Sequence, residues 1–94
     1  MTDTSTLISR LEAGRSDNFL DVEIEVALFE PDDHYSAARA NSAGTKVVYT
    51  LRDGRQETCW AADWSQVTGP HRAIALKALR ASQAAPTQSQ EKSR

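Results

Sequence analysis

The sequence predicts a small α+β domain, with helices towards both ends of the chain and a short three-stranded antiparallel sheet in the middle. Apolar residues recur at helical spacing near the start of the chain and again in VTGPHRAIALKALRAS, residues 67–82. Between these segments, TKVVYTLRDGRQETCW (residues 45–60) places an Asp-Gly pair between two β-rich runs, which is typical of a hairpin. The length of 94 residues allows one domain.

The first helix is expected to begin at Thr4 or Ser5, either of which is a good N-cap, and to end at Gly14 in a left-handed conformation. Its apolar residues fall at helical spacing: Leu7, Ile8 and Leu11.

The segment LDVEIEVALFEP, residues 20–31, fits two periods. As a strand, it would place Asp21, Glu23 and Glu25 side by side on one face, where they repel. As a helix, it has one apolar stripe of Leu20, Ile24, Ala27 and Leu28 and a second of Phe19, Val22, Val26 and Phe29. The N-capping run SDN at residues 16–18 and the stop at Pro31 favour the helix.

The hairpin is predicted to turn through Asp53-Gly54 as a two-residue type I′ turn. This register pairs Tyr49 with Thr58 and Val47 with Trp60, and it also pairs Leu51 with Gln56 and Arg52 with Arg55. One face then holds the core side chains Val47, Tyr49, Leu51, Thr58 and Trp60. The opposite face holds Lys46, Val48, Thr50, Arg52, Arg55, Glu57 and Cys59. The third strand is expected near Tyr35 to Ala40.

The last helix is predicted to start after Thr68 as cap, with Pro70 in its first turn. Its buried stripe is expected to pack closely on the sheet and consists of Ile74, Ala75, Ala78 and Leu79. The polar, Pro-broken segment at residues 82–94 is typical of a disordered tail, so the domain is expected to span residues 1–81.

Composition predicts a thin core, because Leu, Ile, Val and Phe make up 17 of the 94 residues while the net charge is only −2. Residues 1–33 carry a balance of −7 and residues 34–94 a balance of +5. A small domain of this kind gains burial by associating with a copy of itself, so a homo-oligomer is expected.

Cys59 is the only cysteine, which excludes an intrachain disulfide. No signal peptide and no apolar run long enough to cross a bilayer is visible, so a cytoplasmic location is expected.

The sequence predicts no enzymatic activity, no cofactor and no metal site. The stretch PDDHY brings two carboxylates next to His34, but residue patterns of this kind usually form a loop that turns on Asp32 or Asp33. Cys59 in a strand is expected to be a small core residue. P-loop, zinc and Gly-x-Ser-x-Gly patterns are absent from the sequence.

The candidate binding residues are bases and aromatic residues of the second half of the chain, because Arg and aromatic side chains suit both phosphate recognition and protein hot spots. They are Tyr35, Arg39, Lys46, Arg52, Arg55, Trp64, His71 and Arg72. In the alternative interpretation, Trp60 belongs to the core, Trp64 lies at a corner between helix and sheet, and the arginines are ordinary surface residues.

The combination of LISRLEAG, LDVEIEVALF, an aromatic strand region and GPHRAIALKALRA resembles the small tailed-phage and prophage proteins of the phage ABA-sandwich type, over residues 7–81. The resemblance implies a short antiparallel sheet lying between helices from the two ends of the chain, and a helical LDVEIEVAL. The polar hairpin leaves a two-layer α+β arrangement as the alternative.

From size, the lack of catalytic motifs and this resemblance, we expect a phage-type accessory protein that acts by stoichiometric binding. Its partner would be a host protein, such as a component of a defence system that it inhibits or sequesters. The alternatives are a sponge that binds a small nucleotide ligand through an Arg and aromatic surface, and a virion or assembly component. Membrane binding is not expected, and the acidic overall charge disfavours nucleic acid as the partner.

Overall fold

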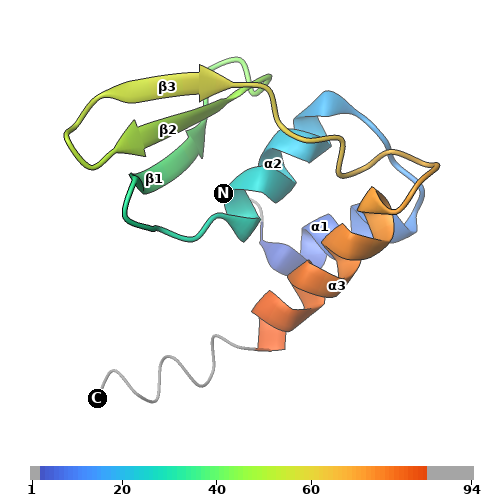
Figure 1. Ribbon diagram of the computed structural model, residues 1–94. Helices are drawn as coiled ribbons and strands as arrows, with labels where there is room; N and C mark the ends of the chain where they lie inside the picture. Colours follow the sequence, from blue (N-terminus) through green and yellow to red (C-terminus); the bar gives the residue numbers. More distant parts are fainter. Residues whose placement is uncertain (1–2, 85–94) are drawn as a thin grey trace.

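The computed structural model describes residues 3–84 and confirms the α+β class (Figure 1). Two helices precede a three-stranded antiparallel sheet of order β1-β2-β3, and a third helix follows it. The elements are α1 (Thr4–Glu12), α2 (Asn18–Leu28), β1 (Tyr35–Ala40), β2 (Val47–Leu51), β3 (Gln56–Cys59) and α3 (His71–Ala84).

Aspartates cap both N-terminal helices. The side chain of Asp3 accepts a hydrogen bond from the Thr6 amide at 2.9 Å, so the cap of α1 lies one residue before the two that the sequence suggested. Asp17 caps α2 by accepting from the Leu20 amide at 2.7 Å. The helical interpretation of the ambiguous acidic segment is confirmed, and α2 ends at Leu28 before Pro31.

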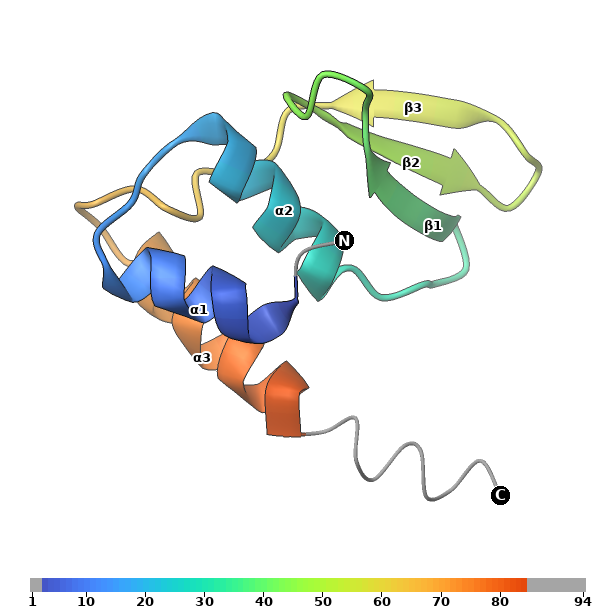
Figure 2. The same ribbon diagram turned by 180° about the vertical axis from the view of Figure 1, so that it is seen from behind.

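Helix α2 forms the middle layer of the molecule, with the sheet on one side and the α1–α3 pair on the other (Figures 1 and 2). This explains its two apolar stripes. Leu20 and Ile24 are fully buried in a cluster shared with α1 and α3, whereas Phe29, just after α2, lies 6.0 Å from the ring of Tyr49 in β2. The sheet is therefore an outer layer, which is not the sandwiched position that the family resemblance implies.

Helix α3 packs on α1 and α2 and not on the sheet, so that part of the prediction is wrong. Ala75 and Leu79 are fully buried in the helical core, but Ile74 is half exposed. The helix also continues through Ala84, where the predicted tail had already begun, and Gln83 donates to the Ser5 hydroxyl at 2.6 Å. The rest of the predicted tail, residues 85–94, lies outside the described residues.

The hairpin turns through three residues, Arg52 to Gly54, and not through two. The Leu51 amide donates to the Arg55 carbonyl at 2.8 Å, and the Gly54 amide donates to the Leu51 carbonyl at 3.0 Å. Gly54 has a φ of +94°, while Asp53 is outside the positive-φ region that a type I′ turn would require. A three-residue loop closed by a left-handed glycine fits these observations.

One extra loop residue shifts the register, so Tyr49 pairs with Glu57 and Val47 with Cys59. Because the side-chain period of a strand is two, this shift moves every β3 side chain to the face opposite the one predicted. We call the side of the sheet towards α2 the helix side; it carries Tyr35, Ala38, Ala40, Val47, Tyr49, Leu51, Glu57 and Cys59. We call the other side the open face, because within residues 3–84 no helix packs on it.

Candidate binding surface on the open face of the sheet

The open face collects side chains from all three strands and their immediate ends. Residues paired across an antiparallel ladder share a face, so Arg39 in β1, Val48 in β2 and Thr58 in β3 form one row across it. The complete set is Ala37, Arg39, Lys46, Val48, Thr50, Gln56, Thr58 and Trp60.

Trp60 is the most prominent member, since 68 % of it is exposed. The ammonium of Lys46 lies 4.6 Å from the centroid of its ring, which is a cation–π geometry. The prediction that Trp60 belongs to the core is wrong. The physical reason is the shifted register, which places Trp60 next to Lys46 on the side of the sheet away from α2.

The open face is basic. Arg39 is opposite Val48, and Lys46 lies two residues from Val48 along β2, so the two cations are diagonal neighbours. None of the side chains in the set is a carboxylate. Within residues 3–84 the ion pairs lie elsewhere and join Arg10 to Glu23, Arg15 to Asp17, Arg55 to Asp53, and Arg80 to Glu12.

Val48 in the centre of the open face is only 6 % exposed, although no described helix covers it. It lies between Arg39 and Thr58 in the row that crosses the three strands. The face therefore has a small, shielded apolar centre with two cations and a tryptophan around it.

The helix side of the sheet has the opposite character, because its polar groups find partners inside the molecule. Glu25 of α2 accepts hydrogen bonds from the Tyr49 hydroxyl at 2.9 Å and from the Trp64 indole at 2.6 Å. Burial and the hydrogen bond to Glu25 raise the pKa of Tyr49 far above its usual value. The Tyr35 hydroxyl donates to Glu57 at 2.9 Å, and its ring lies 5.0 Å from that of Tyr49.

Arg72, a predicted binding residue, is a structural clamp. Its guanidinium donates to the carbonyls of Leu11 and Arg15 near the end of α1 and to the carbonyl of Ser65 in the β3–α3 connection. Ser65 is 1 % exposed. Three backbone acceptors use the donors of Arg72, so this cation holds α1, α3 and the connection together.

The clamp continues through a second buried contact. The amide and hydroxyl of Ser65 both donate to one oxygen of Asp21, at 2.7 and 2.6 Å, and Asp21 is 7 % exposed. The amide of Asp17 donates to the Ser65 hydroxyl at 3.1 Å. We call Asp17, Asp21, Ser65 and Arg72 the polar clamp.

The other predicted residues are spread over the molecule. The indole of Trp64 lies between α2 and the start of α3, and its ring centroid is 6.3 Å from that of the exposed His71. At the hairpin tip Arg52 donates to the Asp32 carbonyl at 2.9 Å, and Arg55 pairs with Asp53 at 2.7 Å. Of the eight predicted binding residues, Arg39 and Lys46 share the open face, and sequence reasoning missed Trp60 beside them.

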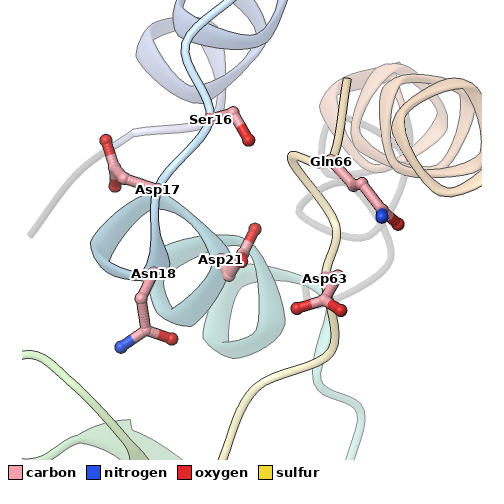
Figure 3. Close-up of a pocket in the computed structure, with 6 residues that line it drawn as sticks. All are labelled: Ser16, Asp17, Asn18, Asp21, Asp63 and Gln66. Carbon is pink, nitrogen blue, oxygen red and sulfur yellow. The ribbon is translucent and has the colours of Figure 1, made fainter. Parts of the chain in front are cut away.

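A shallow hollow of about 290 Å³ lies between the start of α2 and the β3–α3 connection (Figure 3). It is lined by Ser16, Asp17, Asn18, Asp21, Asp63 and Gln66. Two of its carboxylates already serve the fold: Asp21 accepts from Ser65, and Asp17 caps α2. Across residues 3–84 no group of three or more His, Cys, Asp and Glu side chains is placed to hold a metal ion.

The two stretches considered for catalysis have ordinary surroundings. Asp32 accepts from the amides of His34 and Tyr35 at 2.8 and 2.7 Å, which confirms a turn built on Asp32. The hydrogen bond from the Tyr35 amide contributes most, and that from the His34 amide next, to lowering the pKa of Asp32. Cys59 is exposed at the end of β3, so the expectation of a small core residue is wrong.

Comparison with models of protein families, with curated proteins and with solved structures finds no match to this chain. The resemblance to the phage ABA-sandwich type therefore stays a prediction. Among the helices of residues 3–84, none is long and apolar enough to cross a membrane.

Proposed function

We propose that this protein acts without catalysis, by binding an acidic surface of a partner protein with the open face of its sheet. The observation that carries the proposal is the combination of Arg39, Lys46 and an exposed Trp60 on one face. Arg and Trp are enriched among the residues that dominate protein interfaces. Two cations without a carboxylate on their face favour a partner of opposite charge, chiefly through association rate and specificity.

The shape of the surface favours a protein over a small ligand. A three-stranded sheet presents a broad, gently twisted face, whereas small molecules are usually held in concave pockets. The hollow near Asp17 and Asp63 is lined with carboxylates and would repel an anionic ligand.

A nucleotide or a short single strand is the second candidate, and the exposure of Trp60 favours it. An indole that is 68 % exposed can stack on a base, while the neighbouring Lys46 and Arg39 can contact phosphates. This candidate corresponds to the nucleotide sponge expected as an alternative from the sequence.

The resemblance supplies a further part of the proposal, that the protein is a phage-type accessory protein and its partner a host component. Size and the absence of catalytic motifs from the sequence support this part, as they would support a virion component. The basic open face supports the proposal of an acidic partner, but it does not bear on the origin of that partner.

Amide chemical shifts of the ¹⁵N-labelled full chain test the proposal. The probes are a deca-glutamate peptide, ATP and an oligo(dT) of eight nucleotides, each titrated at low salt. We expect the peptide to shift the amides of Arg39, Lys46, Thr58 and the Trp60 indole. The double variant Arg39→Glu/Lys46→Glu should weaken this binding at least tenfold, which is about 1.4 kcal/mol.

Lys77→Glu is the matched control, because Lys77 is an exposed cation on α3, remote from the sheet. It should leave the peptide affinity within about twofold, a difference well below 1 kcal/mol. If ATP or oligo(dT) shifts the amide signals of the open face and the peptide does not, nucleotide binding replaces protein binding as the proposed function. If none of the probes moves these amides, neither candidate stands.

A further inference from the structure

The two outer strands of the sheet differ in how well their free edges are protected. The register of β1 shifts between Tyr35 and Ala37, the strand carries the charged Arg39, and α2 packs along it. Bulges, charges and covering helices are the devices that keep an edge strand from pairing with another chain. The free edge of β1 is therefore protected.

Strand β3 has fewer of these devices, and its one charged side chain, Glu57, accepts a hydrogen bond from the Tyr35 hydroxyl on the helix side. All of its residues, Gln56–Cys59, are exposed, its pairing with β2 is regular, and it contains no proline or lysine. Within residues 3–84 no helix packs on it. Its outer backbone groups thus form a template for a further strand.

The hairpin geometry identifies which backbone groups point outward. The Leu51 amide bonds to the Arg55 carbonyl, so Arg55 points its carbonyl towards β2. Backbone groups alternate along an antiparallel strand, so Glu57 and Cys59 also point inward. The N–H and C=O groups of Gln56, Thr58 and Trp60 are left facing away from the sheet.

We propose that β3 pairs antiparallel with β3 of a second copy of this chain, with Thr58 at the two-fold axis. Thr58 then exchanges two hydrogen bonds with Thr58 of the second copy, and Gln56 does so with its Trp60. Glu57 lies opposite Cys59 of the second copy. Two three-stranded sheets become one six-stranded sheet.

Symmetry and side-chain chemistry favour the register centred on Thr58 over the registers centred on Glu57 or Cys59. A two-fold axis perpendicular to the sheet keeps each side chain on its own face, so residues of equal parity must oppose one another. Centring the axis on Glu57 would place two carboxylates directly opposite, which is unfavourable. Centring it on Cys59 would leave most of β3 unpaired. The axis at Thr58 pairs the whole strand and places two threonines together, a favourable cross-strand pair.

The pairing also extends the open face. The open faces of the two copies become continuous across the axis, and their Arg39, Lys46 and Trp60 side chains are presented on one surface. The pairing rests on the edge of β3 and not on anion binding, so it stands or fails separately from the function proposed above.

Charge at the axis gives a direct test, because residue 58 faces itself. Thr58→Glu and Thr58→Lys each place like charges opposite one another in the dimer but sit on an exposed strand in the monomer. We expect sedimentation equilibrium of the full chain, from 10 µM to 1 mM, to show a dimer for the wild type. Each variant should dissociate at least tenfold more readily, and their equimolar mixture should recover dimer.

Ala37→Glu is the matched control, since it adds the same charge to an exposed position on the same face at the other edge. It should dimerise as the wild type does, and far-ultraviolet circular dichroism should show that all variants fold. A wild type that stays monomeric up to 1 mM overturns the proposal. So does a dimer that both charged variants retain unchanged.

A cysteine pair tests the register. In a pair without hydrogen bonds, opposite Cα atoms lie about 4.5 Å apart, within reach of a disulfide. Glu57→Cys should therefore form a covalent dimer through Cys59 of the second copy when diamide, as oxidant, takes the two electrons and two protons of each thiol pair. The wild type should not, because its two Cys59 residues lie about 8 Å apart in this register. A covalent dimer of the wild type, or none for Glu57→Cys, overturns the register.

Discussion

Two pairs of arginine and tryptophan have the same residue types but different surroundings. Arg72 and Trp64 are hydrogen-bonded inside the molecule, whereas Arg39 and Trp60 are exposed on the sheet. Arg72 and Trp64 direct their donors inward, to three backbone carbonyls and to Glu25. Arg39 and Trp60 lie exposed on the open face, where the Lys46 ammonium lies over the Trp60 ring. Residue type therefore does not separate a structural cation from a binding cation.

What separates them is the supply of acceptors nearby. The end of α1 and the connection before α3 leave carbonyls without helical partners, and a cation satisfies them. The backbone carbonyls of strands lie in the plane of the sheet, whereas the side chain of Arg39 projects from its open face, so the ladder does not direct acceptors towards Arg39. The first pair should therefore matter for stability and the second for binding.

The largest difference is expected between Arg72→Ala and Arg39→Ala. Removing Arg72 deletes three charge-assisted hydrogen bonds and should lower the free energy of unfolding by about 3 kcal/mol. Arg39→Ala should change it by less than about 0.5 kcal/mol, as surface substitutions usually do. Urea denaturation followed by tryptophan fluorescence measures both. Equal losses would show that the two arginines are not distinct in role.

Ser65→Ala should have the next largest effect. It removes the hydroxyl that donates to the buried Asp21 carboxylate, at a cost of about 2 kcal/mol for a weakened buried acceptor. Thr58→Ala on the open face should cost less than about 0.5 kcal/mol at low protein concentration. The same denaturation experiment compares them, and a Thr58 effect as large as that of Ser65 would contradict the distinction.

The two tryptophans sharpen the comparison further. Trp64→Phe loses the hydrogen bond to Glu25 and should destabilise by about 1 kcal/mol, whereas Trp60→Phe should be nearly neutral. Each variant keeps one tryptophan, so fluorescence also separates them. Trp64, which remains in Trp60→Phe, should emit at a shorter wavelength than Trp60, which remains in Trp64→Phe. The reverse order would show that Trp64, and not Trp60, is the more exposed indole.

The smallest effect concerns acid. The hydrogen bond from Arg15, together with the amide of Leu20, lowers the pKa of Asp17. Because the pKa of Asp17 is lower in the folded state, its ionised carboxylate stabilises the folded protein at pH values above the unfolded pKa of 3.8. This stabilisation is lost as the pH falls through the folded-state pKa. Because the Asp17 side chain is 34 % exposed, we expect less than about 1 kcal/mol.

Asp17→Asn keeps an N-cap but cannot titrate. Between pH 5 and pH 3, the wild type should therefore lose more stability than the variant in urea denaturation. Parallel pH profiles for the two proteins would show that Asp17 does not contribute to acid sensitivity.

Sequence reasoning predicts the elements of this fold well where the signal is local. The capping run at residues 16–18 and Pro31 bound α2 correctly, while the burial of both apolar stripes of this segment follows only from the structure. The hairpin was also located correctly. Its register was not, because Asp-Gly fits both a two-residue turn and a three-residue loop with glycine at the left-handed position.

The one extra residue in the hairpin loop determines which side chains form most of the candidate site. With the shifted register Trp60 moves from the core to the open face, and Glu57 leaves that face, which makes it basic. The role of Arg72 was beyond local patterns, because two of its three acceptors, the carbonyls of Leu11 and Arg15, are far away along the chain. The polar composition of β3 was the one local signal that the sheet is not covered on both faces. Its sequence, Gln-Glu-Thr-Cys, is too polar for a strand buried on both sides.

The pairing of α1 with α3 determines when this chain can fold during its synthesis. Leu7 and Leu11 are translated before Ala75 and Leu79, which share their buried cluster. The nascent chain must therefore carry an uncovered apolar helix until α3 has emerged from the ribosome, and such exposed surfaces are what chaperones and proteases recognise. A product that stops before His71 would keep the whole hairpin and still lack the lid of its core, so quality control should remove it.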